Sequence, residues 1–167
     1  MPVNSAAKVV NAAPAASKPA RPGGVGGGTG LPLPSGQLSY FRRDSGPTLT
    51  WNGPYPLPIT GVTGNPVLIQ SRFGASGNFE LVAPAQGGGL AHYWRNNDDP
   101  SYPWSEPTFG GGLGTVGEVA MIQSNFGDPA NLEVIYQAGT EGQLYYLWRD
   151  SGLTFTWNGP YPLVSTT

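Results

Sequence analysis

Two segments of this chain are nearly identical, and this internal repeat restricts the possible folds more than any other feature. Residues 36–57 and 142–163 match at 17 of 22 positions, at an offset of 106. A second match relates the stretch from Asn65 to the stretch from Gly117 at an offset of 53, which becomes 54 in the middle because one loop gains a residue. The unit is therefore about 53 residues long, and the chain holds two full copies and part of a third.

Each full unit divides into four short apolar runs separated by turn-forming residues such as Phe-Gly-Ala-Ser-Gly and Gln-Gly-Gly-Gly. No segment shows a sustained helical period. Four strands in 40 to 50 residues are typical of a β-propeller blade. The sequence thus predicts an all-β chain of propeller-type, four-stranded antiparallel blades whose ring is incomplete in one chain. The expected strands are Val67–Ser71, Asn78–Ala85, Leu90–Asn96 and Trp104–Phe109 in one copy, and Val119–Ser124, Asn131–Gln137, Leu144–Asp150 and Phe155–Tyr161 in the other.

The repeat also predicts the domain boundaries. Residues 1–34 are rich in Ala, Pro and Gly and lack aromatic residues, so we expect a flexible tail, because they bury too little apolar surface to offset the entropy lost on ordering. An alternative is that this segment orders along a neighbouring subunit. Residues 35–60 form a half blade with the third and fourth strands only, and residues 61–114 and 115–164 form full blades.

Composition excludes several classes of function. Only 11% of residues are charged and the net charge is −2, which argues against nucleic acid as a partner. The chain has no cysteine and one histidine, which excludes thiolate sites and a multi-histidine metal site within one chain, and we expect no cofactor. No apolar run is long enough to span a membrane, and the N-terminus lacks the apolar core of a signal peptide.

A family resemblance follows from the recurring motifs. Ile-Gln-Ser-x-Phe-Gly, Asn-Phe-Glu-Leu-Val, His-Tyr-Trp-Arg and Trp-x-x-Pro resemble the blades of PLL-like β-propeller lectins, over residues 36–163. That family includes fucose-binding, seven-bladed lectins. The resemblance implies glycan binding, fucosylated glycans among the ligands, and a secreted or cell-surface location. Since the ring is incomplete, either several copies associate through open blade edges or the chain is a fragment of a longer protein.

The candidate sugar-binding residues recur at the same places in each blade. A Trp can stack on the C–H face of a sugar, and a neighbouring Arg or Glu can bond its hydroxyls. Neighbouring strand residues point to opposite faces, however, so a structural role for part of this set stays open. The candidates are Trp94, Arg95 and Glu80 in one blade, and Trp148, Arg149 and Glu133 in the other; the half blade has Arg42 in place of the Trp.

Other conspicuous residues favour structural roles. Trp51, Trp104 and Trp157 occur once per unit, which favours packing between blades. His92 is replaced by Tyr in the next copy, and Asn96–Asp99 is read as a solvated turn in preference to a Ca²⁺ site. Because the two Glu of the motif belong to different blades, they do not form the paired acids of a glycosidase. We therefore expect no enzyme and no catalytic residues; the alternative to a multivalent lectin is a structural or assembly module that binds other proteins.

Overall fold

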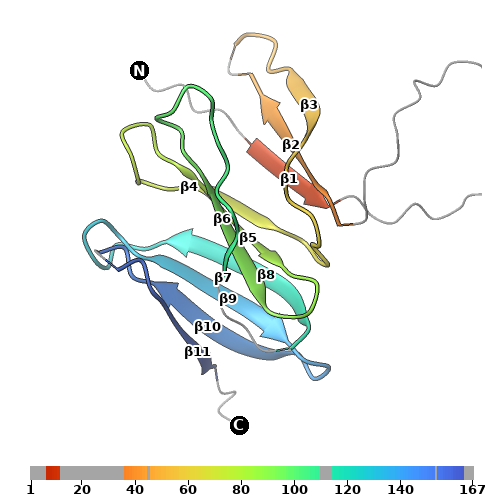
Figure 1. The fold of residues 1–167 in the computed structure, drawn as a ribbon, viewed down its shortest axis with the longest axis vertical. Helices are drawn as coiled ribbons and strands as arrows, with labels where there is room; N and C mark the ends of the chain where they lie inside the picture. Colours follow the sequence, from red (N-terminus) through yellow and green to blue (C-terminus); the bar gives the residue numbers. More distant parts are fainter. Residues whose placement is uncertain (1–6, 12–35, 45, 110–113, 153, 164–167) are drawn as a thin grey trace, which may run out of the picture.

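The computed structural model describes residues 7–11, 36–44, 46–109, 114–152 and 154–163, and these form three antiparallel sheets (Figure 1). We call them the N-terminal sheet (order β1-β2-β3), the middle sheet (β4-β5-β6-β7) and the C-terminal sheet (β8-β9-β10-β11). The expected all-β class and four-stranded antiparallel unit are confirmed, and no sheet of the described residues closes into a barrel. The strands are β1 Ala7–Asn11, β2 Leu38–Arg43, β3 Trp51–Pro56, β4 Val67–Gln70, β5 Phe79–Pro84, β6 Leu90–Arg95, β7 Thr108–Phe109, β8 Val116–Gln123, β9 Leu132–Ala138, β10 Gln143–Arg149 and β11 Trp157–Pro162.

The backbone repeats as closely as the sequence does. Leu49, Tyr102 and Phe155 occupy the same position in the three units, and all adopt a left-handed conformation, with φ of 47°, 49° and 49°. Such a conformation is uncommon for a side chain of this size. Three equivalent occurrences therefore indicate that the same turn precedes the last strand of every sheet.

The N-terminal sheet differs from the predicted half blade. Residues 1–34 were expected to be a flexible tail, but Ala7–Asn11 form β1, which pairs with the edge of β2 from Ala7↔Arg42 to Asn11↔Leu38. This strand takes the place that β5 has beside β6 in the middle sheet. An edge strand with unpaired backbone groups favours such an addition. The rest of the expected tail lies outside the described residues.

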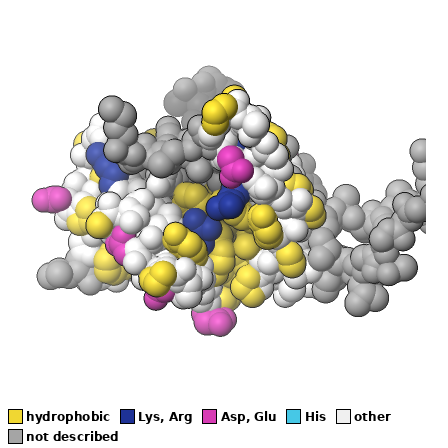
Figure 2. Space-filling view, turned by 90° about the horizontal axis from the view of Figure 1, so that it is seen from above, with side chains coloured by type: hydrophobic (Ala, Val, Ile, Leu, Met, Phe, Trp, Pro, Cys, Tyr) yellow, Lys and Arg dark blue, Asp and Glu magenta, His cyan; other side chains and the backbone are white. Residues whose placement is uncertain are grey.

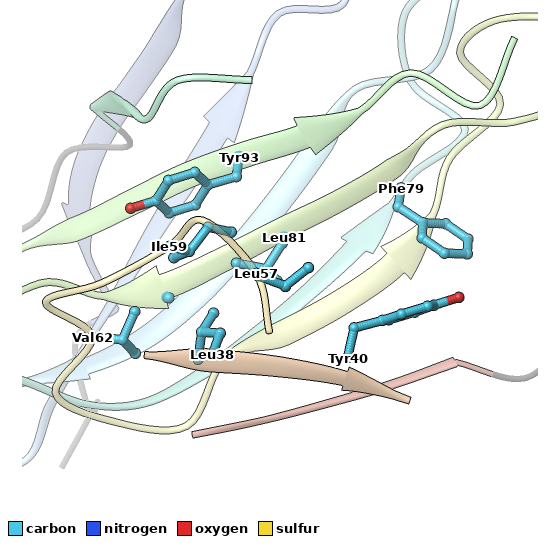
Figure 3. Close-up of a cluster of buried hydrophobic side chains, with 9 residues drawn as sticks. Leu38, Tyr40, Leu57, Ile59, Val62, Phe79, Leu81 and Tyr93 are labelled. Atoms are coloured by element: carbon cyan, nitrogen blue, oxygen red, sulfur yellow. The ribbon is translucent and has the colours of Figure 1, made fainter. Parts of the chain in front are cut away.

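The sheets stack face to face, and two clusters of buried side chains hold them together. One cluster joins the N-terminal and middle sheets (Figure 3). It contains Leu38, Tyr40, Leu57, Ile59, Val62, Phe79, Leu81, Ala83 and Tyr93. The other joins the middle and C-terminal sheets and contains Val82, Leu90, Val116, Met121, Val134, Tyr136, Ala138 and Leu147. Residues of one strand alternate between the clusters, as Leu81 and Val82 do, because successive side chains of a strand point to opposite faces.

Every sheet therefore has two faces with different roles. We call the face that points to the next sheet along the chain the forward face, and the face that points to the preceding sheet the rear face. The order of the stack leaves two faces without a neighbour among the described residues, as Figure 1 shows: the rear face of the N-terminal sheet and the forward face of the C-terminal sheet. Among the described residues, no helix is long and apolar enough to cross a membrane.

The fourth strand of the middle sheet is shorter than expected. Trp104–Phe109 was predicted, but only Thr108–Phe109 form β7, and Trp104 makes an isolated bridge to Arg95. Pro107 lies within this stretch, directly before β7, and lacks the N–H that a ladder needs. Trp104 still packs against the first cluster and Trp157 against the second, as expected for residues between blades.

Candidate functional site

An open groove of about 770 Å³ lies between the N-terminal and middle sheets. Figure 2 looks onto the end of the molecule where it opens, and basic side chains lie there among hydrophobic ones. Strands β2 and β3 supply one wall, and β4 to β6 with their turns supply the other. The lining residues are Tyr40, Arg42 and Tyr55 on the N-terminal sheet, and Gln70, Ser76, Phe79, Arg95, Asn97, Ser101 and Tyr102 on the middle sheet.

Arg95 is the centre of this groove. Its guanidinium carbon lies 4.2 Å from the ring centre of Phe79, 5.2 Å from that of Tyr102 and 5.5 Å from that of Tyr40. Its Nε donates a hydrogen bond of 2.8 Å to Asn97 Oδ1. A guanidinium held by aromatic rings and an amide has a fixed orientation, and its remaining N–H groups are available as donors.

The turns of the middle sheet hold this wall in place. Asp98 accepts hydrogen bonds from the backbone N–H groups of Ala75 (2.8 Å) and Ser76 (2.7 Å), which ties the β6–β7 turn to the β4–β5 turn. These hydrogen bonds, with the Ser76 contact first, lower the pKa of Asp98 from its ordinary value. The Asn97 N–H bonds Asn78 Oδ1 across the same turns. Asn96–Asp99 is thus a structured turn, and no cluster of three metal-ligating side chains occurs in the part of the chain that the structure describes.

The β4–β5 turn of the middle sheet has no counterpart in the described part of the N-terminal sheet, and the groove is open at that place. Between the middle and C-terminal sheets, Phe73 of the β4–β5 turn lies over Arg149 (5.7 Å to the ring centre) and meets Phe155 edge-on at 6.5 Å. Arg149 is the equivalent of Arg95, and the two rings enclose it. The described part of the N-terminal sheet has no such turn, so Arg95 stays accessible from the groove.

The structure separates the predicted sugar-binding residues. Arg95 lines the groove, whereas Trp94 lies on the forward face of the middle sheet, opposite Glu80 in the ladder, with 36% of its surface exposed. Adjacent Trp and Arg thus face different gaps between sheets. Trp148 and Glu133 are paired in the ladder on the forward face of the C-terminal sheet, where no described residue covers them.

Glu80 is buried rather than presented to a ligand. It is 2% exposed, its Oε2 lies 2.7 Å from His92 Nε2, and its Oε1 accepts a hydrogen bond of 3.2 Å from Ser71. Arg149 lies 4.0 Å from Oε2 across the gap between sheets. Thr108 Oγ1 lies 3.0 Å from the other ring nitrogen of His92. The carboxylate is therefore part of a buried polar network between the middle and C-terminal sheets.

Sequence reasoning missed most of the groove. Tyr40, Tyr55 and Tyr102 were not proposed as ligand-binding residues, and neither were Gln70 and Asn97. A signal for Tyr102 exists: it occupies the repeat position that also holds Leu49 and Phe155. Its place beside Arg95, however, depends on which sheet faces are stacked.

Comparisons with known proteins add no relative: no protein-family model, no curated protein and no solved structure matches this chain.

The buried histidine predicts a pH dependence of stability. Burial lowers the pKa of His92 below its ordinary value of 6.5, while the hydrogen bond that the Glu80 carboxylate accepts from the ring opposes this shift and the charge of Arg149 adds to it. Below pH 6.5 the unfolded chain then binds more protons than the folded chain, so the free energy of unfolding should fall as pH falls. We expect urea denaturation to show lower stability at about pH 5.5 than at about pH 7.5, a range above most carboxyl pKa values.

His92→Gln is the control for this pH effect, since glutamine keeps a hydrogen-bonding side chain and does not titrate. The variant should have a lower free energy of unfolding at both pH values. The difference in this free energy between the two pH values should be much smaller than in the native chain. Equal stability of the native chain at the two pH values would contradict the assignment, as would a difference that the variant retains.

Proposed function

We propose that the protein is a non-enzymatic, lectin-like module that binds glycans in the groove between the N-terminal and middle sheets. One observation carries the proposal: Arg95 is oriented by aromatic rings and an amide on the wall of an accessible groove. Sugars are bound by the same combination, in which aromatic faces contact C–H groups and fixed donors bond hydroxyls. Tyr102 and Tyr55 present exposed rings to such a ligand, 54% and 46% accessible.

The charge of the groove adds to its expected selectivity. Arg42 and Arg95 line it, and no carboxylate is among its described lining residues. Charge-assisted hydrogen bonds from arginine are stronger than those between neutral groups. A glycan array should therefore contain acidic glycans beside neutral ones, including the fucosylated glycans that the family resemblance implies. Binding that weakens as salt is raised would identify an acidic ligand.

Tyr102→Ala tests the site. Tyr102 is an exposed turn residue, so the variant should fold, and we expect its affinity for an array-selected glycan to fall by about tenfold or more because the stacking face and the ring beside Arg95 are lost. Calorimetric titration or surface plasmon resonance would measure this change.

Phe155→Ala is the matched control. Phe155 has the same repeat position and the same φ of 49°, and it is exposed to a similar degree, but it covers Arg149 in the closed gap. Glycan affinity should be unchanged in this variant. Equal effects of the two substitutions, or no glycan bound at all, would overturn the proposal.

A second candidate function, an assembly module, is favoured by a different observation. Large apolar side chains lie exposed on the forward face of the C-terminal sheet, among them Ile122, Ile135 and Leu144.

A further inference from the structure

The forward face of the C-terminal sheet repeats a surface that is buried elsewhere in the same chain. Leu90 and Leu144 are equivalent residues, but Leu90 is 1% exposed and Leu144 is 45% exposed. Val82 and Ile135 are also equivalent, at 0% and 44%. The difference arises because the C-terminal sheet covers the middle sheet, whereas no described residue covers the C-terminal sheet. Its forward face therefore has the side chains of a sheet-packing surface without a partner.

The other uncovered face, at the opposite end of the stack, carries the complementary side chains. The rear faces that pack inside the chain present an aromatic or apolar residue, an arginine and a tryptophan: Tyr93, Arg95 and Trp104 in the middle sheet, and Leu147, Arg149 and Trp157 in the C-terminal sheet. The N-terminal sheet has the same set, Phe41, Arg43 and Trp51. Trp51 is 50% exposed, and Arg43 lies 5.9 Å from its ring centre.

The charges of the two free faces also correspond. Inside the chain, Glu80 on a forward face lies 4.0 Å from Arg149 on the rear face that packs against it. Glu133 is the equivalent of Glu80, and Arg43 is the equivalent of Arg149. If the rear face of an N-terminal sheet packs on the forward face of the C-terminal sheet in the same way, Arg43 lies next to Glu133.

The β8–β9 turn, at the edge of the forward face of the C-terminal sheet, supports the same pairing of the two uncovered faces. Phe73 covers Arg149 and contacts Phe155 in the neighbouring sheet. Its equivalent Phe126 is 75% exposed, and Leu49, the equivalent of Phe155, is 50% exposed. The equivalents of both contacting residues, Phe126 and Leu49, are therefore exposed at opposite ends of the stack.

We propose that the forward face of the C-terminal sheet binds the rear face of the N-terminal sheet of a second copy of this chain. The contact is head to tail, because it joins two different surfaces, and it closes into a ring when the rotation allows. Two copies bring together six sheets, within the four to eight blades of typical propellers, so we expect a closed dimer. Inside the chain, Trp94 and Arg149 lie on the two sheet faces that border the gap between the middle and C-terminal sheets. The proposed contact would place their equivalents, Trp148 of one copy and Arg43 of the other, on the two faces of the new gap. This inference does not depend on glycan binding.

Two variants and their mixture test the direction of the contact. Ile135→Arg alters the forward face of the C-terminal sheet, and Trp51→Arg alters the rear face of the N-terminal sheet; both residues are about half exposed, so each chain should fold. Sedimentation velocity at micromolar concentration should show a dimer for the native chain and a monomer for each variant, with self-association weakened about tenfold or more. An equimolar mixture should form a one-to-one dimer through one native contact, because each variant retains the face that the other has lost; the second contact then carries both substitutions, so this dimer should be weaker than the native one but stronger than either variant alone.

Charge reversal gives a second test and a control. Glu133→Arg and Arg43→Glu should each weaken the dimer, and the double variant should restore it, since both charges of the contact are then exchanged. Glu141→Arg makes the same charge change in an exposed turn and should leave the dimer unchanged. A monomeric native chain, variants that keep the native mass, or a mixture that stays monomeric would overturn the proposal.

Discussion

Leu90→Ala is expected to lower the free energy of unfolding by about 2–5 kcal/mol. Leu90 is 1% exposed and belongs to the cluster between the middle and C-terminal sheets, with Val82, Val134 and Leu147. Truncation removes apolar contacts and leaves a cavity between two sheets, whose hydrogen-bonded ladders prevent them from collapsing into it. Urea denaturation followed by tryptophan fluorescence and by circular dichroism would measure the loss.

Leu144→Ala is the control that the repeat provides. The residue type and the repeat position are the same, but Leu144 is 45% exposed, so the expected loss is about 1 kcal/mol or less in the monomer at high dilution. A loss that grows with protein concentration would agree with the head-to-tail contact, because that contact buries Leu144. Equal losses for the two variants at high dilution would contradict the stacking order of the sheets.

Most of the fold could be predicted because the sequence repeats. Two aligned copies show which positions alternate between apolar and polar residues, and the glycine-rich turns mark where each strand ends. Nearly all the expected strands are present, with ends shifted by a few residues. The exceptions have local causes. β1 was missed because Ala7–Asn11 is a short stretch whose pairing depends on the free edge of β2. β7 is short because Pro107, which has no N–H to donate, directly precedes it.

The groove could not be predicted to the same degree. Alternation along β6 indicates that Trp94 and Arg95 face opposite ways, but only the stacking of the sheets shows which gap each one faces. That Arg95 is accessible while Arg149 is enclosed depends on Phe73, a residue of a neighbouring unit. Repeated residues can thus have different surroundings wherever a unit is incomplete.

Glu80→Ala is expected to cost about 3–5 kcal/mol of the free energy of unfolding. The carboxylate is 2% exposed and bonds His92 and Ser71, with Arg149 at 4.0 Å. Truncation leaves the His92 ring nitrogen without its partner and removes the negative charge beside the largely buried Arg149 guanidinium, between two packed sheets. A buried polar group that loses its partner is more costly than the net value of the interaction that it made. Urea denaturation at pH 7.5 would measure the loss.

Two further variants separate the lost partner from the lost side-chain volume. Glu80→Gln keeps the shape and an acceptor oxygen, so it should cost clearly less than Glu80→Ala. Glu133→Ala removes the equivalent carboxylate from the uncovered face of the C-terminal sheet, and in the monomer it should cost about 1 kcal/mol or less. If Glu80→Ala proved as mild as Glu133→Ala at high dilution, Glu80 would not be a buried structural acceptor and would again be a candidate for contact with a ligand. A large loss for Glu80→Ala alone would instead show that the same motif residue stabilises the fold where two sheets are stacked on it and contributes little where its sheet face is uncovered.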